Sequence, residues 1–144
     1  MVEFLLGMNG VAYASGTAGT ALASCTAITN IKDLKLDCSA GEADITTRAN
    51  SGFRATAPTL KEMSIDFQMK WLPGDTGFDM IRTAFLANAT IEFAALDQAR
   101  TVSGAQGPKG SWSITKFSKD ESLEGAQMVD VTLKLSTYSE WVVI

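Results

Sequence analysis

Catalytic chemistry has few possible carriers in this chain, because its 144 residues include no histidine. Without an imidazole there is no Ser-His-Asp triad, no histidine general base and no histidine-ligated metal. The 16 acidic residues could supply a pair of carboxylates, but so many acids make any such pair uninformative. Asp44, Asp66, Glu92 and Asp130 fall at expected outward strand positions, where contact with solvent explains them. We therefore expect no catalytic residue and no enzymatic activity.

Signatures of cofactor and metal binding are equally weak. The run Gly104-Ala-Gln-Gly-Pro-Lys-Gly-Ser contains a lysine, but no helix is expected after it and Pro108 removes a backbone donor. The acidic run Lys119-Asp-Glu-Ser-Leu-Glu is typical of a charged turn, because a calcium site needs several oxygen ligands clustered on one loop. We expect no cofactor and no bound metal.

The two cysteines, Cys25 and Cys38, do not have the spacing of a CxxC redox or zinc motif. Both lie in strand-like sequence, which favours small, buried, reduced thiols, although a bridge between them stays open. The formal net charge of -4 argues against an electrostatic binder of nucleic acid. No stretch approaches the roughly 18 apolar residues of a membrane helix, so no membrane span is expected.

Alternation of apolar and polar residues predicts strands that bury one face. The clearest example runs from Ser64 to Trp71, where every second residue is apolar. Further strands are expected at 24–29, 34–38, 91–93, 112–115 and 129–136. Half-apolar strands are typical of antiparallel sheets with one solvated face.

One segment has helical spacing instead, with Phe78, Ile81 and Phe85 on one stripe. Asp75 or Thr76 can cap its first turn, and Asn88 suits its end, so a helix is expected near 76–88. The expected fold is mainly β, an antiparallel β-sandwich or barrel with one flanking α-helix.

The remaining segments define the expected domain organisation. Residues 1–23 are rich in small uncharged residues and predict an N-terminal arm or loop, and residues 24–144 predict a single β-sandwich domain. A long loop is expected at 39–60, with Phe53 and Arg54 near its tip, and a hairpin connection at 97–109. The apolar C-terminal tail, Glu140-Trp-Val-Val-Ile, predicts contact with its own fold or with a neighbour.

Several runs then occur in a familiar order. They are Ala43-Asp-Ile-Thr-Thr-Arg, Ser51-Gly-Phe-Arg, Pro58-Thr-Leu-Lys-Glu-Met-Ser-Ile-Asp-Phe, Pro73-Gly-Asp, Gly110-Ser-Trp-Ser-Ile-Thr-Lys-Phe-Ser and Leu123-Glu-Gly-Ala-Gln-Met-Val-Asp-Val-Thr-Leu-Lys-Leu-Ser. In this order the chain resembles the tail tube (major tail) proteins of long-tailed bacteriophages, over roughly residues 24–136. No single run is diagnostic. Glu62 stands where the family pattern has aspartate, and the N-terminal arm has no match.

The resemblance implies a structural protein of the virion. Hexameric rings would stack into a hollow tail tube that conducts genome DNA during ejection. The expected partners are further copies of the chain and other tail proteins, namely the tape measure, tail tip and terminator proteins. DNA would pass without specific binding, and assembly would take place in the cytoplasm of the bacterial host.

The resemblance also implies three sets of contact residues. The inter-ring stacking loop would use Asp44, Arg48, Phe53 and Arg54. The C-terminal tail would contact a neighbouring copy of the chain through Trp141, Val142 and Val143. Candidate lumen-facing positions on polar strand faces are Asp66, Gln68, Lys70, Asp130 and Lys134.

The acidic balance fits such a conduit, because basic walls would bind each passing segment of DNA. We therefore expect a channel face without net positive charge. Two other interpretations stay open. One is the tube protein of a related contractile or secretion system, and the other is a monomeric β-sandwich binding module.

Overall fold

A computed structural model describes residues 4–144, and its strands form one seven-stranded antiparallel sheet. The strands are β1 (Val11–Ser15), β2 (Thr26–Ile28), β3 (Ile31–Asp44), β4 (Thr56–Lys70), β5 (Thr90–Leu96), β6 (Gln106–Asp120) and β7 (Met128–Val143). Their order in the sheet is β2-β1-β5-β6-β7-β4-β3. The prediction of a mainly β, antiparallel fold with one helix is confirmed.

The sheet curls over its buried face. The rings of Phe67 in β4 and Phe93 in β5 stack with their centroids 5.8 Å apart. β6 and β7 lie between these two strands in the sheet order, which in a flat sheet would separate them by about 14 Å. A single sheet therefore encloses a sandwich-like core, in which Trp112 is fully buried.

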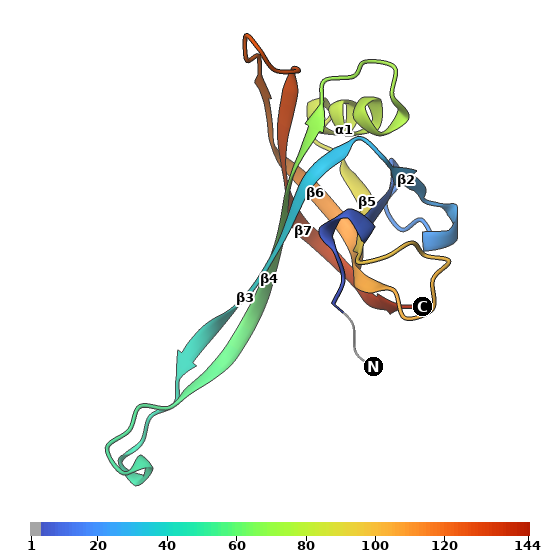
Figure 1. The fold of residues 1–144 in the computed structure, drawn as a ribbon. Helices are drawn as coiled ribbons and strands as arrows, with labels where there is room; N and C mark the ends of the chain where they lie inside the picture. Colours follow the sequence, from blue (N-terminus) through green and yellow to red (C-terminus); the bar gives the residue numbers. More distant parts are fainter. Residues whose placement is uncertain (1–3) are drawn as a thin grey trace.

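Helix α1 (Thr76–Leu86) packs against the sheet near one end of the body (Figure 1). The Asp75 carboxylate caps it by accepting a hydrogen bond from the backbone N–H of Phe78 at 3.1 Å. Phe78 and Ile81 are buried in the main core, as the helical stripe predicts. Asn88 follows the helix with φ of 53°, in the left-handed region that commonly ends helices.

The expected arm at 1–23 is wrong for its central part. β1 lies inside the sheet between β2 and β5, with Ala12, Tyr13 and Ala14 buried. Small uncharged residues suit this strand because protein packs on both of its faces. Residues 16–25, which we call the strap, are irregular apart from a 3-10 turn at Leu22–Ser24. Residues 1–3 of the expected arm lie outside the described residues.

The expected long loop at 39–60 is also wrong in extent. β3 continues to Asp44 and β4 begins at Thr56, so only residues 45–55 are a loop. The β3–β4 hairpin extends well away from the body (Figure 1). Most side chains of residues 39–60 are exposed, so no alternation of apolar and polar residues develops there. Gly41 lies at an irregularity in the β3–β4 register, where a Cβ would come within 2.6 Å of Thr59 Oγ1.

Both cysteines are free thiols. Cys25 is buried, as expected, whereas Cys38 is exposed on β3, which corrects the prediction for that residue. No helix among the described residues is long and apolar enough to cross a membrane.

Candidate assembly surfaces

A polar face extends over β3, β4, β7 and the second half of β6. Lys35, Asp66, Thr132 and Lys116 occupy one cross-strand row, and Thr132 Oγ1 donates a hydrogen bond to Asp66 Oδ1 at 2.6 Å. The strand register places both signs of charge on this face: Lys35, Lys70, Lys116 and Lys134 with Asp37, Glu62, Asp66, Asp120 and Asp130. The carboxylates in this set outnumber the lysines, so the face carries no net positive charge.

The five polar positions that the sequence singles out on β4 and β7 lie together on this polar face. Asp66, Lys70 and Lys134 are exposed, and Gln68 and Asp130 are half-buried and directly opposite each other. The residues between them enter the core, among them Ile65, Phe67, Met69, Val129, Val131 and Leu133. The alternation therefore separates core from surface correctly along these two strands.

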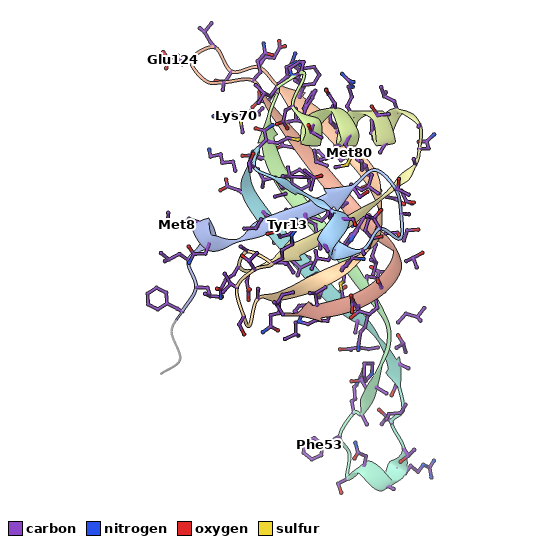
Figure 2. All side chains as sticks on the ribbon, turned by 90° about the vertical axis from the view of Figure 1, so that its right-hand side faces the viewer. Met8, Tyr13, Phe53, Lys70, Met80 and Glu124 are labelled. Atoms are coloured by element: carbon purple, nitrogen blue, oxygen red, sulfur yellow. The ribbon has the colours of Figure 1, made fainter. Side chains whose placement is uncertain are left out.

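The tip of the β3–β4 hairpin, residues 44–56, collects the four expected stacking residues. Asp44, Arg48, Phe53 and Arg54 are all exposed, and 73% of the Phe53 side chain is accessible. Figure 2 shows Phe53 at the end of the hairpin farthest from the body.

Despite this exposure the tip is an ordered turn. The Phe53 N–H donates to the Asn50 carbonyl at 3.0 Å, and Asn50 Nδ2 donates to the Phe53 carbonyl at 3.0 Å. Gly52 has φ of 81°, which glycine adopts without strain. These hydrogen bonds order the backbone at Phe53 before any partner arrives, which lowers the entropic cost of binding.

Asp44 has a local role at the tip. Its Oδ1 accepts a hydrogen bond from the Thr46 N–H at 2.9 Å. Hydrogen bonding by the side chain and backbone of Thr46 holds the pKa of Asp44 below its ordinary value. The carboxylate therefore organises the loop in addition to facing solvent.

The C-terminal tail is the end of β7 and pairs with β6. Val142 is buried within the chain itself, against a small apolar cluster with Tyr13, Ala94 and Leu96. This corrects the prediction for Val142, whose apolar side chain finds its partner in its own fold. Trp141 and Val143 remain exposed, although Trp141 Nε1 donates to Gln106 Oε1 at 3.0 Å.

A buried ion pair lies on the face of β5 that points away from the main core. Lys109 Nζ is 2.8 Å from Glu92 Oε1, and both residues are buried. The prediction of a solvated Glu92 is wrong, because the strap covers this face and the Gly19 N–H donates to Glu92 Oε2 at 2.7 Å. The sequence does contain an indication of this burial, because Glu92 is the one charged residue within an apolar run at 91–96.

Arg100 holds the other end of the strap. One of its guanidinium nitrogens, Nη1, donates to the carbonyls of Leu22 and Cys25, at 2.7 Å each. The guanidinium also lies 4.6 Å from the centre of the Tyr13 ring, and the Arg100 N–H donates to the Tyr13 hydroxyl. Two charged residues, Glu92 and Arg100, therefore fasten the backbone of a strap in which Leu22 is the one large apolar side chain.

Comparison with known proteins identifies solved structures that share this fold. No family model matches the chain, and no curated protein does. Solved structures do match. A chain in the tail of an empty gene transfer agent (GTA) particle, refined with C6 symmetry, superposes with a TM-score of 0.74 at 16% identity, covering 96% of this chain and 98% of that one. A chain of the SPP1 tail tube gives 0.72 at 16% identity, covering 96% and 77%.

The chain has the tail tube fold. A chain from the baseplate of the anti-feeding prophage also matches, with a TM-score of 0.65 at 8% identity and coverage of 100% and 97%. In this chain the tail tube fold leaves long strand edges open. Within the described residues, β3 ends the sheet and pairs only with β4, and Ile114–Asp120 of β6 pair only with β7. Open edges of this length are sites where another chain can pair.

Proposed function

We propose that this chain is the structural subunit of a tail tube, in which six copies form a ring and rings stack into a hollow conduit for DNA. The observation that carries the proposal is the whole-chain likeness to a subunit of a tail refined with C6 symmetry. The chain acts by geometry and carries out no catalysis. Its place is the virion, after assembly in the host cytoplasm.

The four strands of the polar face form the wall of the conduit in this proposal. The free edge of β3 lies on one side of β4 and β7, and the free stretch of β6 lies on the other. Pairing of these edges between neighbouring copies would continue one sheet around the ring and leave neither of these two edges exposed. Asp66, Gln68, Lys70, Asp130 and Lys134 then face the lumen.

Such a lumen suits the passage of DNA. A protein that neutralises phosphates with lysine or arginine gains affinity by releasing counterions. The polar face intersperses lysines with carboxylates, so it offers DNA no continuous basic track. DNA can then move through the tube without being bound.

The remaining exposed residues supply the other contacts. Arg48, Phe53 and Arg54 of the hairpin tip would join one ring to the next, and Trp141 and Val143 would contact a neighbouring copy. Rings at the ends of the tube would meet other tail proteins, which include the tape measure, tail tip and terminator proteins. A tube of a contractile or secretion system is less favoured, because the anti-feeding prophage chain is less similar than the tail chains.

Electron microscopy of the purified protein tests the proposal directly. We expect six-fold rings or hollow tubes, together with a mass by light scattering that is a multiple of six copies. A species that stays at the 15.3 kDa of one chain at every concentration would favour the monomeric binding module and overturn the proposal.

A further inference from the structure

An apolar groove of about 1030 Å³ lies between β3 and the strands β1, β5 and β6. Its apolar lining includes Val11, Ile28, Leu34, Leu36, Pro108 and Trp141. Met8 lies at its rim and is 84% exposed. The groove exists because the curled sheet does not close: β2 and β3 follow each other in sequence, yet they are at opposite ends of the strand order.

The charges beside the groove are mainly acidic. Asp33 and Asp97 both line it, together with a single lysine, Lys32. Leu34 and Trp141 are 40% and 43% exposed, so apolar surface in the groove is open to solvent in the single chain. A contiguous apolar surface bounded by charge is typical of an interaction site.

The hairpin tip has the complementary chemistry. Phe53 and Ile45 are exposed apolar side chains, and Arg48 and Arg54 are the charges beside them. Aromatic and arginine side chains are both enriched at protein interfaces. The tip therefore offers an apolar side chain for the groove and two cations for its two aspartates.

The tip of a chain cannot reach the groove of that same chain. β4 leaves β7 at Ser64, and from there to the tip the hairpin runs on without another strand beside it. At about 3.3 Å per residue this stretch is roughly 30 Å long, and it leads away from the body (Figure 2). Leu34 in the groove pairs with Phe67, which is 14 residues from Phe53, so a second copy displaced by about 45 Å along the hairpin would bring its Leu34 level with Phe53.

We propose that the hairpin tip of one copy binds in the groove of another copy, with Phe53 against Leu34 and Trp141, and the arginines toward Asp33 and Asp97. This inference rests on the proposed function, since the second copy belongs to the adjacent ring. The contact joins two different surfaces, so it does not close on itself and can add copies without limit along one direction.

Disulfide trapping tests the contact. In a Cys38→Ser background, Ser51→Cys at the exposed hairpin tip, which leaves Phe53 in place, is combined with Met8→Cys at the groove rim. The matched control combines Ser51→Cys with Glu124→Cys, and Figure 2 places Glu124 at the opposite end of the molecule from Phe53. Mild oxidation of assembled protein should give a ladder of multimers on a non-reducing gel for the groove pair alone, because each copy then carries both halves of the link.

The outcomes separate the two proposals. Tubes with a ladder specific to the groove pair support the contact. Tubes in which the groove pair gives no ladder, or in which the Glu124 pair links as efficiently, overturn the groove and leave the proposed function standing. Failure of the wild-type chain to form rings or tubes overturns both.

A second pair of variants needs no cross-linking. Phe53→Ala and Leu34→Glu should keep the circular dichroism spectrum of the wild type and still form rings, but should shorten the tubes at least tenfold. Tubes of normal length in either variant count against the contact.

Discussion

The Lys109 ammonium and the Glu92 carboxylate form an ion pair, with Nζ and Oε1 2.8 Å apart, beneath the strap. Burying a charge away from water costs free energy, and each member of the pair offsets that cost for the other. Loss of one partner would therefore leave the other charge buried and uncompensated. Glu92 also accepts the Gly19 N–H, which links the pair to closure of the strap.

Replacing Glu92 with glutamine should destabilise the fold by about 3–5 kcal/mol, because Lys109 would remain buried without its counter-charge. Urea denaturation followed by circular dichroism measures the change. The matched control is Lys35→Gln, which breaks the exposed Lys35–Asp37 pair at 3.7 Å and should cost less than about 1 kcal/mol. Equal effects of the two substitutions would contradict the role given to burial.

Replacing Arg100 with methionine should open the strap while the main core stays intact, because the carbonyls of Leu22 and Cys25 lose their charged donor. The two thiols report this in one chain. Cys38 is exposed, whereas Cys25 is buried and its burial raises the pKa of its thiol, so Cys25 should react slowly in the wild type. We expect Arg100→Met to speed labelling of Cys25 at least tenfold and to leave Cys38 unchanged. An unchanged Cys25 rate would show that Arg100 does not hold the strap.

Replacing Gly107 with alanine should prevent folding. A Cβ at this position would lie 1.8 Å from the Ala95 carbonyl oxygen, and that backbone belongs to the paired strand β5. Gly125→Ala is the control, since its nearest contact would be the flexible Ser122 side chain at 3.4 Å. Soluble yield and thermal unfolding measure both variants, and a folded Gly107→Ala protein would require a different β5–β6 packing.

The hairpin tip should loosen in acid. The pKa of Asp44 is lowered in the folded chain by hydrogen bonding with Thr46, so its contribution is complete above the ordinary value of 3.8 and is lost as the pH falls through the lowered value. The protection factor of the Thr46 amide, which is its exchange rate relative to an unstructured amide at the same pH, should therefore fall in that acid range. Asp44→Asn removes the ionisation and should abolish this pH-dependent change in protection; its persistence in the variant would assign the effect to another group.

Reversing charge on the polar face should slow the passage of DNA. Asp66→Lys combined with Asp130→Lys would make the proposed lumen basic, and counterion release would then favour binding of each passing segment. We expect tubes of normal appearance and slower ejection in a time-resolved DNA release assay. Charge reversal at Glu124, outside that face, is the control, and unchanged ejection in the double variant would place the lumen elsewhere.

Whether alternation predicts the buried and exposed faces of a strand correctly depends on what packs against each side of that strand. β4 and β7 have the core on one side and solvent on the other along their paired stretch, so alternation assigned Phe67 and Asp66 to their correct faces. Glu92 was misassigned because β5 has protein on both sides, and alternation alone cannot show that a strap covers the second face. The hairpin has solvent on both sides at residues 39–60, which removes the alternation and makes strand resemble loop.

The exposure of the tip residues was predicted from a different signal. Phe53 beside Arg54 in a polar, glycine-containing segment has no place in a core, and the structure indeed leaves Phe53 exposed. The groove could not have been found this way, because Leu34, Pro108 and Trp141 are far apart in sequence and meet only through the curl of the sheet.

The position of β1 also bears on how the chain is made. Val11–Ser15 pair with β5, about 80 residues later in the sequence, and the strap closes only over that finished pair. Synthesis adds roughly 5–20 residues per second, so several seconds pass between the synthesis of β1 and the synthesis of its partner β5. β7, which lies between β6 and β4 in the sheet, emerges after the other six strands. Nascent chains that stall before residue 128 therefore lack the strand that holds the two halves together, and they expose the strand edges of β4 and β6 that β7 covers in the finished fold.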